Sequence, residues 1–306
     1  MSVLRRVRVR VPASTSNLGP GFDCLGMALG LYNDLVVEMH SEDGPSVVAV
    51  RGEGAGSLPS DEKNLMVQAA ARAIAGRFKN RLVFKAVNRI PLARGLGSSA
   101  AAIVAGLAAG SRLARRGPLD REQIFARAAE LEGHPDNAAP AVFGGVSVCV
   151  KDGASMSRFA LRPHRDLVAV LCIPNFELAT AKARAALPRT VPRATAVANI
   201  SRALLLASAI ERGRWDDLAC AMEDSLHQPY RAPLIPGFSE VLAAARAAGA
   251  CGAALSGSGS AMLALCRRGP RAAAIGAAMR RAFAARRVAS RAVVLPIARQ
   301  GVSVQE

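Results

Sequence analysis

Residues 91–101 read Pro91-Leu92-Ala93-Arg94-Gly95-Leu96-Gly97-Ser98-Ser99-Ala100-Ala101. A strand-like run over residues 82–87 precedes this stretch, and an Ala-rich helical pattern over residues 99–116 follows it. The two glycines at 95 and 97 allow positive φ and let the backbone N–H groups form a concave nest. The start of the helix adds unpaired N–H groups and the positive end of its dipole. The stretch therefore predicts a cradle for phosphate groups.

A second interpretation of residues 91–101 stays open when they are taken alone. A Gly-rich turn between a strand and a helix, with a serine as the N-cap, has the same composition. The stretch is also not a P-loop, because no lysine follows its second glycine. The other polar motifs of the chain have to decide between these interpretations.

The chain has a formal net charge of +17 over 306 residues, which raises the question of nucleic-acid binding. Its basic residues are spread from Arg5 to Arg299, however, and aromatic residues for base stacking make up only 4%. We interpret the charge as arginines on solvated faces and expect no nucleic-acid partner. A nucleic-acid-binding protein would be the rival class, and its binding would fall steeply with salt. The positive field would still attract an anionic nucleotide.

The cysteines and the N-terminal residues indicate the cellular compartment of the protein. Six cysteines stand far apart and form no C-x-x-C pair, which argues against a zinc site and against a disulfide framework. The N-terminal residues show no apolar signal core, and the longest apolar run, residues 100–110, is too short to span a bilayer. We therefore expect a cytoplasmic protein with reduced cysteines and no membrane contact.

The N-terminal segment combines a strand with a polar loop. Residues 3–11 alternate apolar and arginine side chains, which is the period of a half-buried strand. Residues 13–23, which include Asn17 and Asp23, then concentrate hydroxyls, an amide and a carboxylate in a turn-rich segment. Substrate-binding loops on rigid scaffolds have this character, although Asn17 and Asp23 also fit ordinary turn positions. Residues 31–39 and 46–51 are predicted as further strands of an antiparallel start.

A second polar cluster lies at residues 129–137. The sequence Ala129-Glu130-Leu131-Glu132-Gly133-His134-Pro135-Asp136-Asn137 ends a helix at its glycine and proline. A polar turn after a helix explains the glycine and the proline but not the gathering of acids, imidazole and amide. We favour a functional cluster. Asn64 stands where another helix begins, and its simple role is an N-cap.

The pattern restarts near residues 151–153, so we place a domain boundary there and predict domains 1–150 and 151–306. In the second domain, residues 180–187 form a short helix, and residues 253–261 form a second Gly/Ser turn. Residues 228–237 carry three prolines around Arg231 and are not expected to form regular structure. A phosphate nest, a second Gly/Ser turn and clustered acids together indicate nucleotide-dependent phosphoryl transfer. Magnesium fits such a site, because it takes oxygen ligands and keeps waters.

The residues that carry these motifs make the chain resemble the GHMP kinases and, within them, the homoserine kinases. Three superfamily motifs occur in family order, at residues 11–23, 91–101 and 255–260. More specific to homoserine kinases are Gly19-Pro20-Gly21-Phe22-Asp23, Glu132-Gly133-His134-Pro135-Asp136-Asn137, Thr180-Ala181-Lys182-Ala183-Arg184 and Pro229-Tyr230-Arg231. The resemblance covers nearly the whole chain.

The resemblance implies a fold and an activity. The fold is α+β in two domains, an N-terminal domain like domain 2 of ribosomal protein S5 and a C-terminal ferredoxin-like α/β domain. The activity is the ATP-dependent phosphorylation of L-homoserine to O-phospho-L-homoserine in threonine biosynthesis, with Mg²⁺. By family analogy a homodimer is compatible with this assignment. Another GHMP kinase acting on a mevalonate-pathway alcohol is the enzymatic rival, and a non-catalytic relative is a third alternative.

The resemblance also implies roles for individual residues. The loop Pro91 to Ala101 would wrap the ATP phosphates, and Asn64 would lie near the base. Ser98 and either Glu130 or Glu132 would hold Mg²⁺. The side chains around the amino acid would be Asn17, Asp23, His134, Asp136, Asn137, Thr180, Arg184 and Arg231. Asp23 suits the ammonium group, and the two arginines suit the carboxylate, which a guanidinium binds in bidentate fashion.

Position 137 departs from the wider superfamily. Mevalonate-type kinases have an aspartate there that can act as a base, whereas Asn137 cannot accept a proton at neutral pH. Homoserine kinases share this asparagine. Our hypothesis is that Asn137 and Ser98 help to align the reaction without a strong general base, while Asp136 keeps a base mechanism open.

Overall fold

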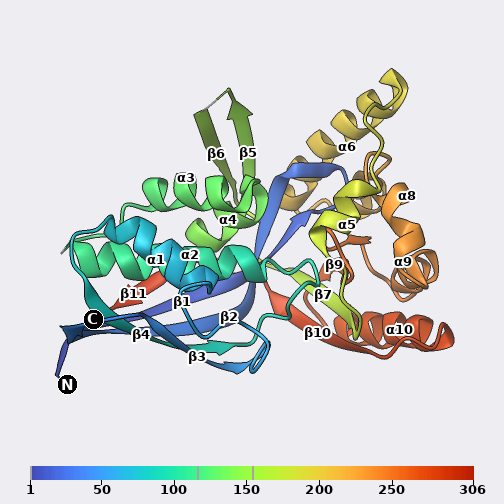
Figure 1. Ribbon diagram of the computed structural model, residues 1–306. Coiled ribbons are helices and arrows are strands. Elements are labelled where there is room, and N and C mark those ends of the chain that lie inside the picture. Colours follow the sequence, from blue (N-terminus) through green and yellow to red (C-terminus); the bar gives the residue numbers. More distant parts are fainter. Residues whose placement is uncertain (1, 116, 154) are drawn as a thin grey trace.

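The computed structural model describes residues 2–115, 117–153 and 155–306, which fold around two β-sheets (Figure 1). The first sheet has the strand order β11-β1-β2-β4-β3, and the hairpin β5–β6 joins it through β2. The second sheet has the order β10-β7-β9-β8. Figure 1 shows the first sheet with helices α1 to α4 above it, and the second sheet beside it with helices α9 and α10. The two-domain α+β expectation is confirmed.

The first sheet is built on one long hairpin, β1 (Val3–Asn17) and β2 (Gly21–Asp43). β4 (Asn80–Asn88) pairs antiparallel with β2, and β3 (Val47–Gly52) pairs parallel with β4. The predicted alternation is present at the start of β1, but residues 11–17 are all buried. The strand therefore continues through the segment that we predicted as a loop, because both of its faces are covered there, and the turn is confined to residues 18–20.

Four helices cover one face of this sheet: α1 (Leu65–Ile74), α2 (Ser98–Ala114), α3 (Arg121–Glu132) and α4 (Pro135–Phe143). Two glycines in α2 allow it to approach α1 closely. A Cβ at Gly106 would lie 2.3 Å from the carbonyl oxygen of Met66, and one at Gly110 would lie 2.5 Å from that of Ala70. The predicted end of α2 at Arg116 lies outside the described residues.

The predicted boundary at residue 151 falls inside the hairpin of β5 (Val146–Asp152) and β6 (Ser155–Leu161). Both strands belong to the first sheet, so the chain changes sheets only after Leu161. The end of the chain also returns, because β11 (Ser303–Gln305) pairs with β1. The restart of the pattern near residue 151 therefore coincides with the turn of a hairpin within the first sheet.

The second sheet contains β7 (Leu167–Pro174), β8 (Gly252–Leu255), β9 (Met262–Arg267) and β10 (Ser290–Pro296). Every residue of β7 is buried. Val168 and Val170 face a core shared with α9 (Phe238–Ala247) and α10 (Arg271–Ala285). Ala169 and Leu171 belong to the large core of the first sheet. The continuous apolar run of β7 follows from this burial on both faces.

The remaining elements are short helices and one long one: α5 (Thr180–Ala185), α6 (Arg193–Arg212), η1 (Trp215–Asp217), α7 (Leu218–Ala221), α8 (Gln228–Arg231) and η2 (Ala232–Leu234). The expectation that residues 228–237 lack regular structure was wrong. Pro229 and Pro233 stand in the first turns of α8 and η2, where a missing N–H costs nothing.

Helix α6 is long and apolar enough to cross a membrane by length and composition. Its buried Asn199, however, donates to the carbonyl of Pro20 and to Asp224, so polar bonds fix this helix to the rest of the protein. Val197, Ile200 and Leu204 lie exposed on it.

Candidate active site

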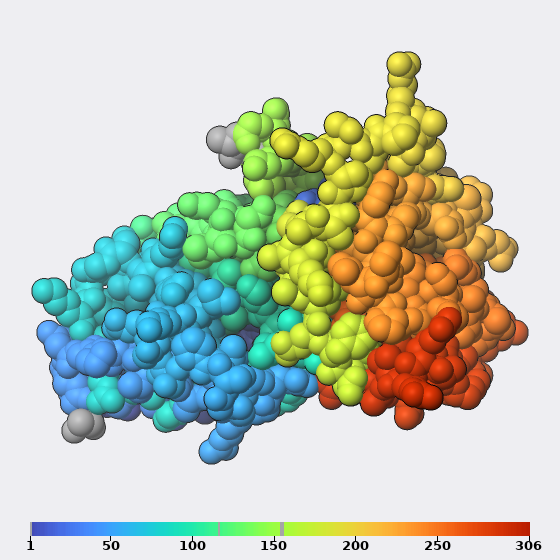
Figure 2. Space-filling view, turned by 45° about the vertical axis from the view of Figure 1, so that its right-hand side comes forward, coloured from blue at the N-terminus to red at the C-terminus, as the bar shows by residue number. Residues whose placement is uncertain are grey.

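Three segments that are far apart in the sequence meet at one cavity. The N–H of Ser14 in β1 donates to the carbonyl of Leu96 (3.2 Å), and the N–H of Gly257 donates to the carbonyl of Ser16 (3.1 Å). The hydroxyl of Ser256 closes the set by donating to the carbonyl of Gly95 (2.7 Å). These hydrogen bonds hold the motifs of residues 11–23, 91–101 and 255–260 together. In the space-filling view the N-terminal and C-terminal parts of the chain meet along a broad seam (Figure 2).

The phosphate loop adopts the predicted backbone conformation. Gly95 has φ 72° and Gly97 has φ 67°, and Gly97 is the N-cap of α2. No side chain caps this helix, so the alternative of a serine N-cap does not hold. A Cβ at Gly95 would lie 2.0 Å from the carbonyl oxygen of Ser256, and this packing excludes other residues there.

Most of the loop lines the cavity, and the rest supports it. The lining residues from this loop are Pro91, Ala93, Arg94, Gly95, Leu96, Gly97, Ser98 and Ser99. Ala100 and Ala101 are buried in α2 beneath them, and Leu92 lies outside the lining. The loop thus presents N–H groups and two serine hydroxyls, with no charged side chain of its own beyond Arg94.

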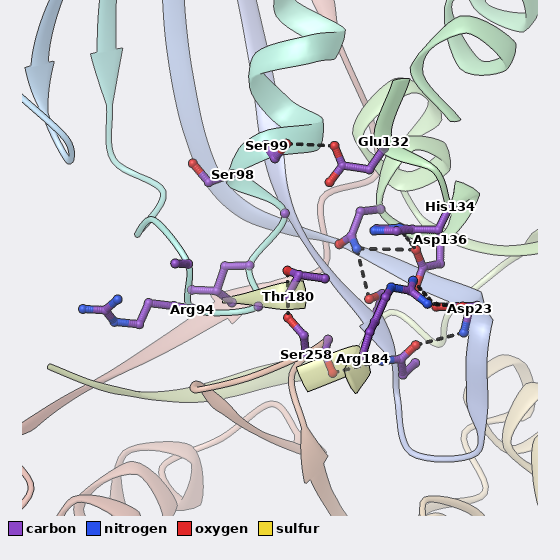
Figure 3. A pocket seen from close by; sticks show the side chains of 18 of the residues that line it. Asp23, Arg94, Ser98, Ser99, Glu132, His134, Asp136, Thr180, Arg184 and Ser258 are labelled. Carbon is purple, nitrogen blue, oxygen red and sulfur yellow. Dashed lines mark hydrogen bonds and ion pairs between the residues drawn. The ribbon is translucent and has the colours of Figure 1, made fainter. Parts of the chain in front are cut away.

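The side chain of Arg94 stabilises the conformation of the phosphate loop. Its guanidinium donates to the carbonyls of Leu92, Pro174 and Asn175, at 3.0 Å each. Figure 3 shows it extending away from Glu132, Asp136 and Arg184. Arg94 therefore fastens the loop to the end of β7.

Only one of the two candidate glutamates faces the cavity. Glu132 lines it, and its carboxylate accepts a hydrogen bond from the Ser99 hydroxyl (2.9 Å; Figure 3). Burial raises the pKa of Glu132 in spite of that bond. Glu130 is exposed and pairs with Arg72 at 3.8 Å on the outer surface. The sequence left these two residues as alternatives, and the geometry leaves Glu132 as the carboxylate that a cation in the cavity could reach.

The cluster at residues 134–137 sits where α3 ends and α4 begins. The sequence indicated only the end of α3, because Pro135 is also the first residue of the next helix. The first turn of α4 buries Asp136 and Asn137 at the floor of the cavity. The side-chain oxygen Oδ1 of Asn137 accepts a hydrogen bond from the Ser14 hydroxyl (2.8 Å), and its side-chain Nδ2 donates to the Ser16 hydroxyl (3.1 Å). These bonds fix the orientation of the Asn137 amide.

Asp136 and His134 form a close pair, with 2.6 Å between the carboxylate Oδ1 and the imidazole Nδ1. Burial alone would lower the pKa of His134, but the hydrogen bond and charge of Asp136, together with the charge of Glu132, raise it. Both residues line the cavity. The carboxylate of Asp136 is therefore engaged by the imidazole in this state.

Asp23 and Arg184 bind each other at one wall of the cavity. The guanidinium of Arg184 donates two parallel hydrogen bonds of 2.9 Å to the Asp23 carboxylate, which raises the pKa of Arg184 (Figure 3). Asp23 adopts φ 56°, and its N–H donates to the side chain of Asn17 (3.0 Å). The resemblance suggested that these groups take the two charges of an amino acid. In the structure the two groups neutralise each other.

Arg231 is the third guanidinium that lines the cavity, after Arg94 and Arg184, and it is almost completely buried, with 2% of its surface exposed. It donates to the carbonyls of Ala183 (3.3 Å) and Gly257 (3.2 Å). Within the described part of the chain it pairs with no carboxylate. Because a buried charge is costly unless it is paired, this group is suited to an anion from outside the protein.

Thr180 lies at the same wall as Arg184. It lines the cavity, and its hydroxyl lies 3.3 Å from that of Ser258. Asn64 does not line the cavity. Its side chain caps α1 by accepting from the N–H of Met66 (3.0 Å) and donates to the carbonyl of Pro59 (2.7 Å). These bonds confirm the N-cap role of Asn64, and its place near the ATP base stays a prediction.

Sequence reasoning missed the serines that orient Asn137. Ser14 and Ser16 belong to the N-terminal motif, and their alternation in β1 places both on one face of the strand. Ser258 belongs to the Gly/Ser turn and also lines the cavity. A strand assignment for residues 12–17 would have identified the pair of serines.

Comparisons with known proteins agree with this architecture. The family description "GHMP kinases N terminal domain" matches residues 64–145, and "GHMP kinases C terminal" matches residues 206–285. The homoserine kinase of Moorella thermoacetica is 47% identical over 279 residues, which cover 90% of this chain and 92% of that protein. The homoserine kinase of Deinococcus radiodurans is 46% identical over 86% of this chain and 85% of its own length.

Solved structures show the same fold. The crystal structure of homoserine kinase from Cytophaga hutchinsonii superposes with a TM-score of 0.90 at 28% identity, covering 100% of this chain and 99% of that one. The L. major mevalonate kinase in complex with R-mevalonate reaches a TM-score of 0.66 at 14% identity over 93% of this chain and 94% of that one, which is a likeness of fold alone.

Proposed function

The chain belongs to the homoserine kinase family of GHMP kinases, and we propose that the cavity described above binds ATP and homoserine on opposite walls. The protein transfers a phosphoryl group from ATP to the side-chain hydroxyl of homoserine, giving ADP and O-phosphohomoserine. One observation carries the assignment of the walls. The α2 wall offers backbone N–H groups, whereas the opposite wall offers Arg184, Arg231 and Asp23.

The loop wall suits the triphosphate. N–H groups at residues 95–99 and at the start of α2 bind phosphate oxygens in the positive field of the helix dipole. Ser98 and Glu132 would hold Mg²⁺, because a hydroxyl and a desolvated carboxylate are the hard oxygen ligands it prefers. When bound, the ion neutralises charge on the phosphate oxygens. Ser99 keeps Glu132 turned towards the loop.

The opposite wall suits a zwitterion. A free amino acid carries one ammonium and one carboxylate, and the Asp23–Arg184 pair presents the complementary charges. We propose that homoserine opens this pair, so that its ammonium binds Asp23 and its carboxylate binds Arg184 and Arg231. A simple alcohol without these charges could not replace the two hydrogen bonds between Arg184 and Asp23, so it would gain no binding energy by opening the pair.

The floor of the cavity would align the hydroxyl. The Asn137 amide is held by two serines and accepts no proton at neutral pH, so it positions the hydroxyl and does not deprotonate it. Asp136 is bonded to His134 and is the remaining base candidate. If Asp136→Asn abolished turnover while leaving both substrate affinities unchanged, alignment without a base would be the wrong mechanism.

An ADP-release assay tests the function directly. Homoserine, serine, threonine and mevalonate are each supplied with ATP and Mg²⁺. We expect the highest kcat/KM with homoserine and weak turnover of mevalonate, which lacks the ammonium group. Equal turnover of mevalonate and homoserine would overturn the amino-acid assignment of the arginine wall.

A further inference from the structure

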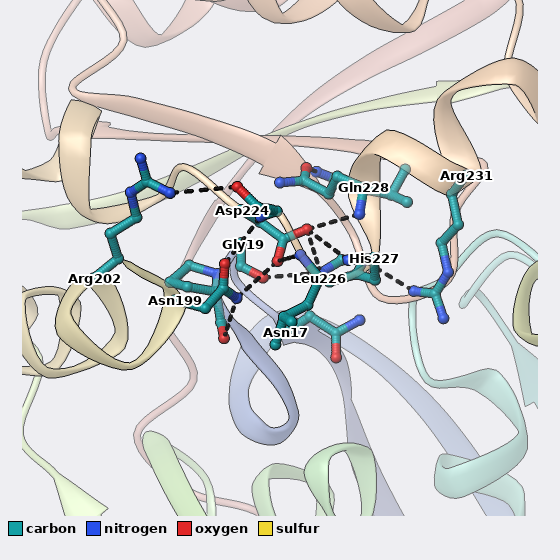
Figure 4. A network of polar contacts seen from close by, with 12 residues as sticks. Asn17, Gly19, Asn199, Arg202, Asp224, Leu226, His227, Gln228 and Arg231 are labelled. Carbon is teal, nitrogen blue, oxygen red and sulfur yellow. Dashed lines mark hydrogen bonds and ion pairs between the residues drawn. The ribbon is translucent and has the colours of Figure 1, made fainter. Parts of the chain in front are cut away.

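A buried polar network behind the cavity connects α6, the loop after β1 and α8 (Figure 4). Its centre is Asp224, which accepts from the N–H groups of His227 (3.0 Å) and Gln228 (2.7 Å) and from the Asn199 amide (2.9 Å). The side chain of Gln228 in turn accepts from the N–H of Leu255 (2.7 Å). The network thus fixes the start of α8, the helix that carries Arg231.

His227 lies between this network and Arg231 and is completely buried. Its Nε2 lies 2.8 Å from the carbonyl oxygen of Gly19, which can only accept, so Nε2 carries the proton. Its Nδ1 lies 3.1 Å from Nη1 of Arg231, which can only donate, so Nδ1 carries none. The two neighbours therefore specify one neutral tautomer of the imidazole.

The surroundings keep this imidazole neutral. Burial lowers the pKa of His227 and Arg231 lowers it further, against the opposing charges of Asp224, 3.5 Å away, and Asp23. Phe22 stacks on the ring at a centroid distance of 5.2 Å and also lies beneath the guanidinium of Arg231, at 5.3 Å. A protonated imidazole would place two cations in contact.

We propose that His227 is a positioning residue for homoserine binding: its unprotonated Nδ1 accepts from Arg231 and fixes that guanidinium at the carboxylate subsite. The inference rests on the proposed function of the arginine wall. Arg231 needs such a fixed acceptor because its other partners are two backbone carbonyls and it has 2% exposure, so a misplaced guanidinium has no water to bind. His227 does not line the cavity, so in this proposal it acts on homoserine only through Arg231.

Two substitutions separate this role from a merely structural one. An asparagine at 227 places its carbonyl oxygen near the position of Nδ1, and a glutamine places its amide near that of Nε2. His227→Asn thus keeps the acceptor for Arg231, whereas His227→Gln keeps the donor to Gly19. We expect His227→Gln to raise the homoserine KM about ten- to a hundredfold, since a hydrogen bond to a charged group is lost, and to leave the ATP KM and kcat nearly unchanged. His227→Asn should come much closer to the wild type.

The outcomes distinguish the inference from the proposed function. If the wild type does not phosphorylate homoserine, the function fails. If the wild type does so and the two variants have the same homoserine KM, the inference fails. In an Arg231→Ala background His227→Gln should add little to the homoserine KM, and a full additional effect would contradict coupling through Arg231.

A measurement on the wild type avoids any folding defect of the variants. The chain has 4 histidines, so a ¹⁵N-histidine NMR spectrum is simple enough to assign. We expect His227 at pH 7 as the neutral tautomer with the proton on Nε2, and its Nδ1 signal should shift when homoserine binds. A proton on Nδ1, or a charged ring, would overturn the proposal.

Discussion

The wall built by residues 93–99 and the wall built around Arg184 and Arg231 face the same cavity but provide positive potential by different means. The first uses backbone N–H groups and a helix terminus, with glycines where a side chain would collide. The second uses two guanidinium groups. Arg184 on α5 is held by Asp23 of β2, and Arg231 on α8 is held by the buried network around His227. Backbone N–H dipoles can bind a polyanion in several conformations, whereas fixed guanidinium groups bind one carboxylate in a defined geometry. Substitutions in the two walls should therefore change different kinetic constants.

The largest effect is expected from Gly97→Ala in the loop wall. A Cβ at Gly97 would lie 2.0 Å from the Ser14 hydroxyl oxygen and 3.1 Å from the side-chain oxygen Oδ1 of Asn137, and the φ of Gly97 is 67°. We expect kcat/KM to fall about a hundredfold or more, because the added methyl displaces the group that orients Asn137. Gly76→Ala is the matched control, since Gly76 has φ 72° and nothing within 4 Å of its Cβ position. If both variants lost equal activity, backbone strain alone would explain the result.

The next effect concerns selectivity between the walls. Arg184→Ala should raise the homoserine KM roughly ten- to a hundredfold and change the ATP KM little, because it removes a charged partner of the amino acid. Arg94→Ala is the counterpart, as Arg94 fastens the loop wall through three carbonyls. It should affect the ATP KM more than the homoserine KM. Equal effects of Arg184→Ala on both constants would contradict its role at the carboxylate.

A smaller effect separates the two glutamates. Glu132→Gln should raise the Mg²⁺ concentration for half-maximal activity about tenfold, because a neutral amide is a weaker ligand than a carboxylate. Glu130→Gln should match the wild type, since Glu130 lies on the surface beside Arg72. Titrating Mg²⁺ at saturating ATP and homoserine measures the Mg²⁺ requirement of both variants. An unchanged requirement in Glu132→Gln would remove this residue from the metal site.

The sequence predicted the loop wall better than the arginine wall, for a physical reason. The conformation of residues 95–99 is local, because Gly95 and Gly97 permit it whatever surrounds them. Local signals also predicted β3 and the helix after residue 98. The contacts of Arg184 and Arg231 depend on how α5, α8 and the start of β2 at Asp23 meet, and no local pattern encodes that. Their pairing with an amino acid came from family resemblance and stays a prediction.

The errors have similar causes. Residues 13–17 are a strand because burial on both faces overrides their turn-like composition. α4 was missed because Pro135 both follows one helix and begins another. Glu130 and Glu132 were left as alternatives, yet two residues along a helix are about 200° apart, so only one could face the cavity. Periodicity could therefore have excluded having both as ligands, but only the fold shows which one faces inwards.

The smallest effect concerns stability at the floor between the walls. The pKa of His134 is raised above its ordinary value of 6.5, so protonated His134 bound to Asp136 stabilises the folded state. This contribution is complete below pH 6.5 and is lost as the pH rises through the raised pKa. His134→Gln should therefore be less stable than the wild type by about 1–2 kcal/mol at pH 6, and the difference should shrink by pH 9. Thermal unfolding at both pH values measures it. In an Asp136→Asn background the pH-dependent part should vanish, because the partner of the imidazolium is no longer an anion, and its persistence would assign the raised pKa to some other group.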